Sequence, residues 1–207
     1  SNTASKDGIQ NESLINSPPP ETSKITFDYE QEKEKYDNLI SDKDIQIEKE
    51  NFEGGYHETI YLKSMPYDIT KKIKSFESIP NPPHNFPFEL DEFQKKSILC
   101  LENRESVLVS AHTSAGKTVV AQYAIAMAKR DHQRVIYTSP IKALSNQKYR
   151  DLKELFGDVG LMTGDVTRNE NASCIVMTTE ILRNMLFKGN EITKEIAWVI
   201  FDEVHYM

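Results

Sequence analysis

The chain has 207 residues, 32 of them acidic and 25 basic, which gives a formal net charge of -7. No apolar stretch approaches the ~20 residues that a membrane span needs, and the N-terminal residues lack the apolar core of a signal peptide. We therefore expect a soluble intracellular protein without a membrane segment. The two cysteines, Cys100 and Cys174, lie in apolar contexts outside any closely spaced Cys/His set, which predicts reduced core residues and no structural metal.

Residues 1–53 predict a disordered leader. They are rich in Ser, Asn, Pro and charged side chains, and so offer little apolar surface to offset the entropy of ordering; a short helix around Tyr29 to Ile40 is the alternative. Residues 54–85 predict a partly ordered segment, with a strand over 57–62 and an extended proline-rich linker. The net acidic charge argues against nonspecific coating of nucleic acid, although a few contacts could still grip a single strand.

Residues 86–207 alternate between strand-like and helix-like patterns. The periodicity predicts helices over 90–101, 117–129, 142–156 and 179–187, and strands over 106–110, 134–138, 159–162, 173–177 and 197–201. Such alternation is typical of an α/β doubly wound parallel sheet with right-handed crossovers and helices on both faces. Strand 106–110 is expected to be buried, and the continuously apolar strand 197–201 is expected to be central and buried on both faces.

The segment Ala111-His-Thr-Ser-Ala-Gly-Lys-Thr118 fits the phosphate-binding loop pattern. Its predicted place between a strand and a helix N-terminus points free backbone N-H groups and the positive end of the helix dipole at an anion. We expect Lys117 to reach the β and γ phosphates of a nucleoside triphosphate and the Thr118 hydroxyl to join a Mg²⁺ shell. The remaining loop residues that we expect at the nucleotide are His112, Thr113, Ser114, Ala115 and Gly116. An ordinary strand-to-helix turn is the alternative.

Two carboxylates, Asp202 and Glu203, follow the last apolar strand directly. Ligands of α/β sheets bind at the carboxyl ends of the strands. We expect Asp202 to hold Mg²⁺, directly or through water, and Glu203 to orient and deprotonate the water that attacks the γ-phosphate. A solvated acidic turn is the alternative.

Three further polar segments follow predicted strands, and with the two motifs above they carry a resemblance to a family. They are Ser139-Pro-Ile-Lys-Ala-Leu-Ser-Asn-Gln-Lys-Tyr-Arg150, Thr163-Gly-Asp165 and Thr178-Thr-Glu-Ile-Leu-Arg183. The chain resembles the DExH-box RNA helicases of superfamily 2, with these segments at motifs Ia, Ib and Ic and Asp202-Glu-Val-His205 at motif II. The resemblance implies that residues 86–207 are a RecA-like ATP-binding domain that stops after motif II.

The amino-acid sequences of these motifs are similar to those of the exosome-assisting helicases. This group includes a nuclear member and a cytoplasmic superkiller member. Leu161-Met-Thr-Gly-Asp165 and Val204-His-Tyr-Met207 favour the nuclear one. The resemblance implies ATP and Mg²⁺ as cofactors and RNA, the exosome and its adaptor proteins as partners. It also implies a location in the nucleus or nucleolus, with the cytoplasm as the alternative.

The resemblance assigns roles to residues that carry little signal alone. Phe88 and Gln94 match the adenine-recognising residues of the family, whereas alone they would be a core aromatic and a solvated helix residue. His205 would couple the triphosphate state to RNA, or be an ordinary packed or solvated residue. The implied contacts to the RNA backbone come from Pro140, Lys142, Gly164, Asp165, Thr178, Thr179, Glu180 and Arg183.

These expectations converge on an ATP-dependent RNA helicase, N-terminal part, acting 3' to 5' as its family does. A nucleotide-responsive RNA- or protein-binding module without turnover is the second hypothesis, because the arginines that stabilise transition-state charge in such helicases come from a second domain. A DNA helicase is disfavoured only by the similarity of the motif sequences to RNA helicases. Contacts to the nucleic-acid backbone do not distinguish RNA from DNA unless the protein also recognises the 2'-OH.

Overall fold

The computed structural model describes residues 44–64, 72–111, 116–189 and 191–204. The predicted leader falls largely outside the described residues. The chain divides into two units, residues 1–45 and 46–207, and almost everything described below belongs to the second.

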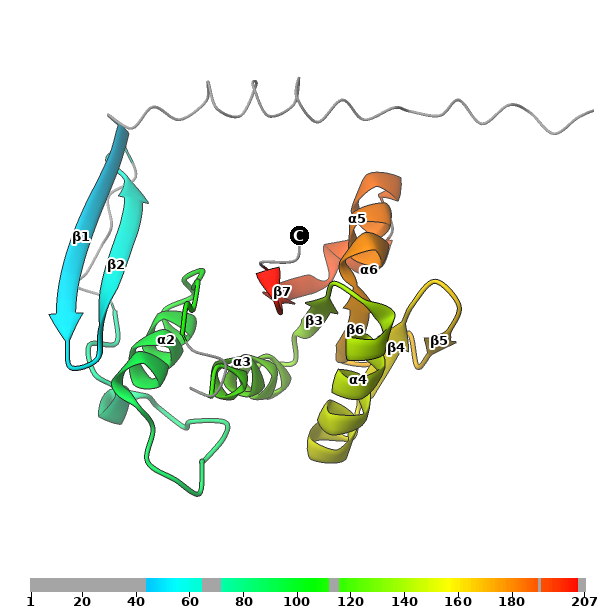
Figure 1. The fold of residues 1–207 in the computed structure, drawn as a ribbon, viewed down its shortest axis with the longest axis horizontal. Coiled ribbons are helices and arrows are strands. Elements are labelled where there is room, and N and C mark those ends of the chain that lie inside the picture. Colours follow the sequence, from blue (N-terminus) through cyan, green and yellow to red (C-terminus); the bar gives the residue numbers. More distant parts are fainter. Residues whose placement is uncertain (1–43, 65–71, 112–115, 190, 205–207) are drawn as a thin grey trace, which may run out of the picture. The chain divides into compact units, whose positions relative to one another are not determined.

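The main sheet has five strands in the order β5-β4-β6-β3-β7, and Figure 1 traces them through the second half of the chain. β3 pairs in parallel with β6 and β7, β4 pairs in parallel with β6, and only the pairing of β5 with β4 is antiparallel. Because the four longer strands are parallel, their carboxyl ends lie at one edge. The bounds are β3 Arg134–Ser139, β4 Val159–Met162, β5 Thr167–Arg168, β6 Cys174–Thr178 and β7 Ile196–Phe201.

The helices agree with the predicted periodicity. α4 begins and ends at the predicted residues, and its buried side chains Ser145, Tyr149 and Leu152 recur at the three- and four-residue spacing of one helix face. α3 is buried on nearly all sides, as its alanine-rich sequence allows. The bounds are η3 Phe76–Ser78, α2 Glu92–Glu102, α3 Thr118–Arg130, α4 Lys142–Phe156, α5 Thr179–Lys188 and α6 Glu191–Lys194.

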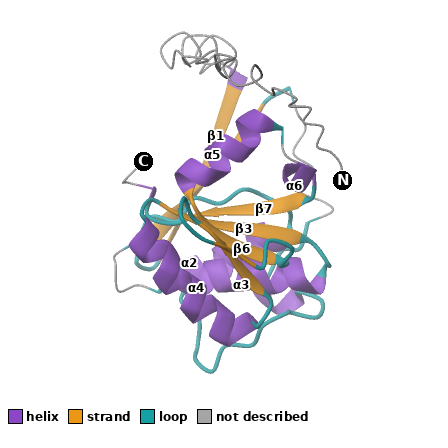
Figure 2. Ribbon diagram, turned by 90° about the vertical axis from the view of Figure 1, so that its right-hand side faces the viewer, coloured by secondary structure: helices purple, strands orange, loops and turns teal. Residues whose placement is uncertain are grey.

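Helices cover both faces of the sheet. On one face, Ile125 of α3 and Leu152 of α4 pack against side chains such as Val176 of β6. On the other face, Leu182 of α5 packs against Ile175 and neighbouring residues. Figure 2 shows α3 and α4 on one side of the strands and α5 on the other. The prediction of a doubly wound α/β domain is therefore confirmed.

The predicted buried strand over 106–110 is wrong. The structure assigns no strand there, and the described residues provide no ladder partner for its backbone. Val107 and Val109 pack against the cluster formed by α2 and α3, while Leu108 between them is 80% exposed. The segment therefore has the alternation of an extended chain, but alternation alone does not supply the neighbouring strand that a sheet requires.

The prediction that 197–201 is a central strand buried on both faces is also wrong. Among the described strands β7 pairs with β3 alone and lies at the edge of the sheet. Trp198 and Ile200 pack against the cores beneath the sheet, whereas Val199 and Phe201 on the opposite face are 37% and 48% exposed. Apolar composition predicted the strand correctly, but it could not predict the position in the strand order.

An N-terminal hairpin corrects the boundary of the predicted leader. β1 (Ile45–Phe52) and β2 (Gly55–Leu62) form a two-stranded sheet, so residues 45–52 are in a strand rather than in the leader, and β2 contains the predicted strand 57–62. Glu50 of β1 forms an ion pair of 2.8 Å with Lys96 of α2, and the cation of Lys49 lies 3.8 Å from the centre of the Tyr56 ring. A cross-strand contact such as that of Lys49 with Tyr56, together with the ion pair to α2, lets a charge-rich sequence form a hairpin.

Gly160 of β4 is packed against the turn that follows β5. A Cβ atom at this position would lie 2.2 Å from the carbonyl oxygen of Asn169. Because the obstacle is backbone, Gly160→Ala is expected to lower the free energy of unfolding by about 2 kcal/mol, as over-packed sites do. Urea denaturation measures this loss, and Gly164→Ala, whose added Cβ would make only an ordinary contact of 3.5 Å with the end of the Lys142 side chain, controls for the glycine replacement itself. Equal losses in both variants would contradict the steric explanation.

The two cysteines are free and buried, as predicted. Cys174 lies within the main sheet core, and Cys100 lies on α2 with its sulfur 3.8 Å from a ring nitrogen of His57. Burial raises the pKa of both thiols to about 12. None of the helices in the described part of the chain has the length and apolarity to span a bilayer.

Candidate nucleotide and nucleic-acid site

The C-terminal end of the predicted phosphate loop leads directly into α3. Lys117 precedes the first helical residue, Thr118, whose side chain is exposed. The Nζ of Lys117 donates a hydrogen bond of 2.7 Å to the carbonyl of Ala111, the residue at the other end of the loop. The lysine thus spans the loop from end to end. His112, Thr113, Ser114 and Ala115 lie outside the described residues.

Gln94 is built into the base of this loop. Its Oε1 accepts a hydrogen bond of 2.9 Å from the backbone N-H of Asp91, and its Nε2 donates one of 3.2 Å to the carbonyl of Gly116. The residue is only 4% exposed, so the reading of Gln94 as a solvated helix residue is wrong. Gly116 has a φ of 74°, and a Cβ there would lie 2.8 Å from Nε2 of Gln94. Glycine is therefore required at this contact.

Phe88 is exposed rather than part of the core. The residue is 52% exposed, and its ring lies 5.6 Å, centroid to centroid, from the ring of Phe86. The reading of Phe88 as a core aromatic is therefore wrong. An exposed ring in the segment that leads into α2 offers a face on which a planar base could stack.

Asp202 is held where β7 ends beside β3. Its backbone N-H donates a hydrogen bond of 2.9 Å to the carbonyl of Thr138. The hydroxyl of Tyr137 donates to Oδ2 of Asp202 over 2.6 Å, and Nζ of Lys148 lies 3.6 Å from the same oxygen. Burial, together with the adjacent carboxylate, raises the pKa of Tyr137 far above its usual value, so the phenol stays protonated and is the donor.

Glu203 adopts a backbone conformation that glutamate seldom takes. Its φ is 55°, in the left-handed region, and its side chain is partly buried. Conformations of this kind cost free energy and cluster at functional sites. His205, the predicted coupling residue, lies outside the described residues.

The donor set fits Mg²⁺. The Thr118 hydroxyl and the Asp202 carboxylate are hard oxygen ligands, which Mg²⁺ prefers. No group of three or more His, Cys, Asp or Glu side chains is placed to hold a metal among the described residues. Mg²⁺ at phosphate sites needs only one or two protein carboxylates beside phosphate and water.

The predicted RNA contacts gather at the same edge of the sheet. Nζ of Lys142, at the start of α4, pairs with Oδ2 of Asp165 over 2.5 Å, and Gly164 lies beside this lysine. A hollow of about 560 Å³ opens between the ends of β3, β4 and β6. Its lining residues are Pro140, Ile141, Lys142, Gly164, Thr178, Glu180 and Ile181. The structure thus brings together residues from Pro140 to Ile181, which come from three separate segments of the chain.

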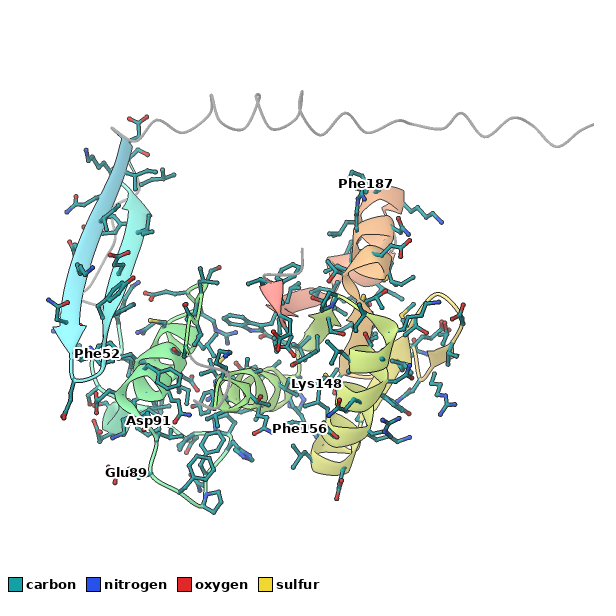
Figure 3. The ribbon with its side chains drawn as sticks, in the orientation of Figure 1. Phe52, Glu89, Asp91, Lys148, Phe156 and Phe187 are labelled. Carbon is teal, nitrogen blue, oxygen red and sulfur yellow. The ribbon has the colours of Figure 1, made fainter. Side chains whose placement is uncertain are left out.

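The predicted RNA-contact residues at the start of α5 differ in their exposure to solvent. Thr178 is 6% exposed and precedes the helix without a side-chain capping bond, while the Thr179 hydroxyl donates to the carbonyl of Ser139 over 3.4 Å. Glu180 and Arg183 are exposed, and the guanidinium of Arg183 lies 5.7 Å from the centre of the Phe187 ring, near the end of α5 in Figure 3. Solvent therefore reaches Glu180 and Arg183 but not Thr178.

Sequence reasoning missed Tyr137 and Lys148. Tyr137 lies in a buried strand, where an aromatic residue normally indicates core, and Lys148 lies in the middle of a charged helix. Neither position carries a local signal, because their shared partner Asp202 lies more than 50 residues away.

The fold and the polar groups at its carboxyl edge are those of a RecA-like α/β domain. Residues 91–207 match the model of the DEAD/DEAH box helicase family. The chain belongs to this family.

The relatives that contain a similar segment are considerably longer than this chain. The chain is 62% identical over 166 residues to the DExH-box ATP-dependent RNA helicase DExH9 of Arabidopsis thaliana, an alignment that covers 80% of the chain and 16% of the relative. It is 70% identical over 122 residues to the Exosome RNA helicase MTR4 of Homo sapiens, covering 59% and 12%. Identity to Superkiller complex protein 2 of Mus musculus is 58% over 145 residues, covering 70% and 12%. The chain thus spans well under a fifth of the length of these relatives.

Proposed function

We propose that this chain forms the ATP-binding part of an RNA helicase that acts 3' to 5' and unwinds structured RNA for processing and decay by the exosome. The observation that carries the proposal is the placement of two sets of groups along one edge of the sheet. Asp202 lies at the end of β7, next to β3, and the Lys142–Asp165 pair lies at the ends of β3 and β4. The residues that we expect to act on the nucleotide would thereby be neighbours of those that we expect to contact RNA.

Each nucleotide-site residue has a role that its chemistry supports. Lys117 would bind the β and γ phosphates, and Phe88 and Gln94 would recognise adenine, Phe88 by stacking and Gln94 through its amide. The Gln94 amide also holds the base of the loop through Gly116. Thr118 and Asp202 would hold Mg²⁺, which when bound neutralises charge that develops on the transferred phosphoryl group. Glu203 would orient the attacking water and accept its proton. The loop residues that are not described, His112 to Ala115, would donate backbone N-H groups to phosphate.

The RNA contacts would be to the sugar-phosphate backbone. The ammonium of Lys142, the guanidinium of Arg183 and the N-terminal amides of α4 and α5 suit phosphate oxygens and carry no base information. Such a surface suits an enzyme that translocates along many sequences. His205 would link this surface to the nucleotide.

We further propose that the chain comes from the nuclear member of its subfamily, with the exosome and its adaptors as partners. The motif sequences at residues 161–165 and 204–207 support this choice. The sequence identity is also higher to the Exosome RNA helicase than to the Superkiller complex protein. Cytoplasmic mRNA decay is the alternative. Imaging of the tagged intact protein separates the two.

The proposed function is tested by steady-state ATP hydrolysis of the intact protein with single-stranded RNA, with DNA of matched sequence, and without nucleic acid. Stimulation by RNA in excess of that by DNA is expected. Nucleotide binding without stimulated turnover would support the binding module instead. Equal stimulation by both nucleic acids would remove the RNA assignment but leave the motor intact.

Lys142→Ala is expected to raise the RNA concentration that gives half-maximal stimulation by about tenfold, since one charge-assisted contact to phosphate is lost. Basal ATP hydrolysis should not change. Lys49→Ala is a matched control, because Lys49 is also exposed and ion-paired, at 3.2 Å from Glu58, but lies on the N-terminal hairpin. An unchanged RNA requirement in Lys142→Ala would argue against the proposed RNA edge.

A further inference from the structure

We propose that Tyr137 and Lys148 are positioning residues that act on Asp202 in opposite ways. The Tyr137 hydroxyl holds the carboxylate in place for a divalent cation, and the Lys148 ammonium competes with that cation for the carboxylate. This inference rests on the proposed function, because it takes Asp202 as the metal-binding carboxylate of the nucleotide site.

The two contacts converge on one oxygen atom. The Tyr137 hydroxyl lies 2.6 Å from Oδ2 of Asp202, and Nζ of Lys148 lies 3.6 Å from it. Among the described residues these are the side chains that contact the carboxylate, and both do so through Oδ2. Neither of these two contacts uses the other oxygen, Oδ1.

Tyr137 is a rigid anchor. It is 2% exposed, lies in the middle of β3, and packs with side chains of α3, α4, β4 and β6. The register of β3 with β7 fixes its backbone opposite Ile200, two residues before Asp202. A buried ring on a paired strand cannot follow the carboxylate if it rotates, so the hydroxyl restricts Asp202 to one orientation. Such supporting hydrogen bonds orient metal ligands in many sites.

Lys148 comes from a different element, α4, where Figure 3 labels it. Its ammonium lies 5.9 Å from the centre of the Tyr137 ring and 3.6 Å from Asp202, so it is held by the same two residues. A cation this close neutralises part of the negative charge that would attract a divalent ion. α4 also begins at Lys142, on the proposed RNA edge. A shift of this helix would move the competing cation relative to the carboxylate.

The test measures metal binding separately from turnover. Mn²⁺ is titrated into the intact protein with a nonhydrolysable ATP analogue, and free Mn²⁺ is followed by electron paramagnetic resonance. Tyr137→Phe is expected to weaken Mn²⁺ binding by about tenfold, the loss typical of a supporting hydrogen bond. Lys148→Met, which keeps the apolar stem and removes the charge, is expected to strengthen it by about fivefold.

The chain supplies matched controls for both variants. Tyr123 is equally buried and its hydroxyl donates over 2.7 Å to Glu102, so Tyr123→Phe removes the same type of bond away from the site. Lys153 also lies on α4, with its ammonium 5.4 Å from the centre of the Tyr149 ring. Tyr123→Phe and Lys153→Met should bind Mn²⁺ as the unchanged protein does. General loosening of the fold would weaken binding in all four variants, whereas the proposal requires opposite signs at Tyr137 and Lys148.

Asp202→Asn separates failure of this inference from failure of the proposed function. If it leaves nucleotide-dependent Mn²⁺ binding intact, the assignment of Asp202 as the metal ligand is wrong, and the proposed site with it. If Asp202→Asn abolishes binding while Tyr137→Phe matches Tyr123→Phe, only the positioning role is overturned. Weaker binding in Lys148→Met would likewise overturn the competing role of that lysine.

Discussion

Glu203→Gln is expected to lower RNA-stimulated ATP hydrolysis by about 100-fold or more, the usual contribution of a general base. The amide nearly matches the carboxylate in size but cannot accept the proton of the attacking water. Glu203 is also held in a left-handed conformation, with a φ of 55°, that fixes where its side chain leaves the end of β7. Turnover at saturating RNA measures the loss, and the affinity for nucleotide should be kept.

Glu195→Gln controls for the loss of a carboxylate near the same strand. Glu195 directly precedes β7, at the opposite end from Glu203, and lies 3.3 Å from Arg134. It should hydrolyse ATP at the unchanged rate. Turnover in Glu203→Gln within about twofold of the unchanged protein would mean that another group activates the water.

Lys117→Ala is expected to weaken ATP binding by at least about tenfold, because charge-assisted hydrogen bonds to phosphate are lost. The effect on diphosphate binding should be smaller than that on triphosphate, since the lysine also reaches the γ-phosphate. Its removal also breaks the 2.7 Å bond across the loop to Ala111. Isothermal titration with both nucleotides measures the two affinities.

Lys129→Ala is the matched control at the other end of α3. Its Nζ also donates to a backbone carbonyl, that of Phe156, over 2.9 Å. This variant therefore loses a lysine and a lysine–carbonyl bond without touching the loop. Unchanged ATP affinity in Lys117→Ala would refute the phosphate site.

The sequence correctly predicted the elements that are specified by the spacing of residues within their own segment. The helix over 142–156 matches α4 at both ends, because its apolar positions recur at helical spacing and a strand precedes it directly. The parallel sheet followed from the alternation of such elements. The loop and the carboxylates could be proposed from the sequence because each is a short run of contiguous residues.

Features that depend on distant partners were not predictable. Residues 106–110 have the composition of a strand, yet pairing is decided by neighbours that the segment itself does not specify. The same holds for β1, where Glu50 and Lys49 suggested disorder until their partners on α2 and β2 were known. In the site, the burial of Gln94 depends on the carbonyl of Gly116, which lies 22 residues further along the chain.

The rates at which the two buried cysteines react with a thiol reagent would report local unfolding of the domain. A thiol reacts with alkylating reagents through its thiolate, and a pKa of about 12 leaves almost none of that form at neutral pH. Modification of Cys174 therefore requires the sheet core to open, while modification of Cys100 requires α2 to separate from its surroundings. The two rates would describe the fluctuations of two different regions of the domain without any engineered label.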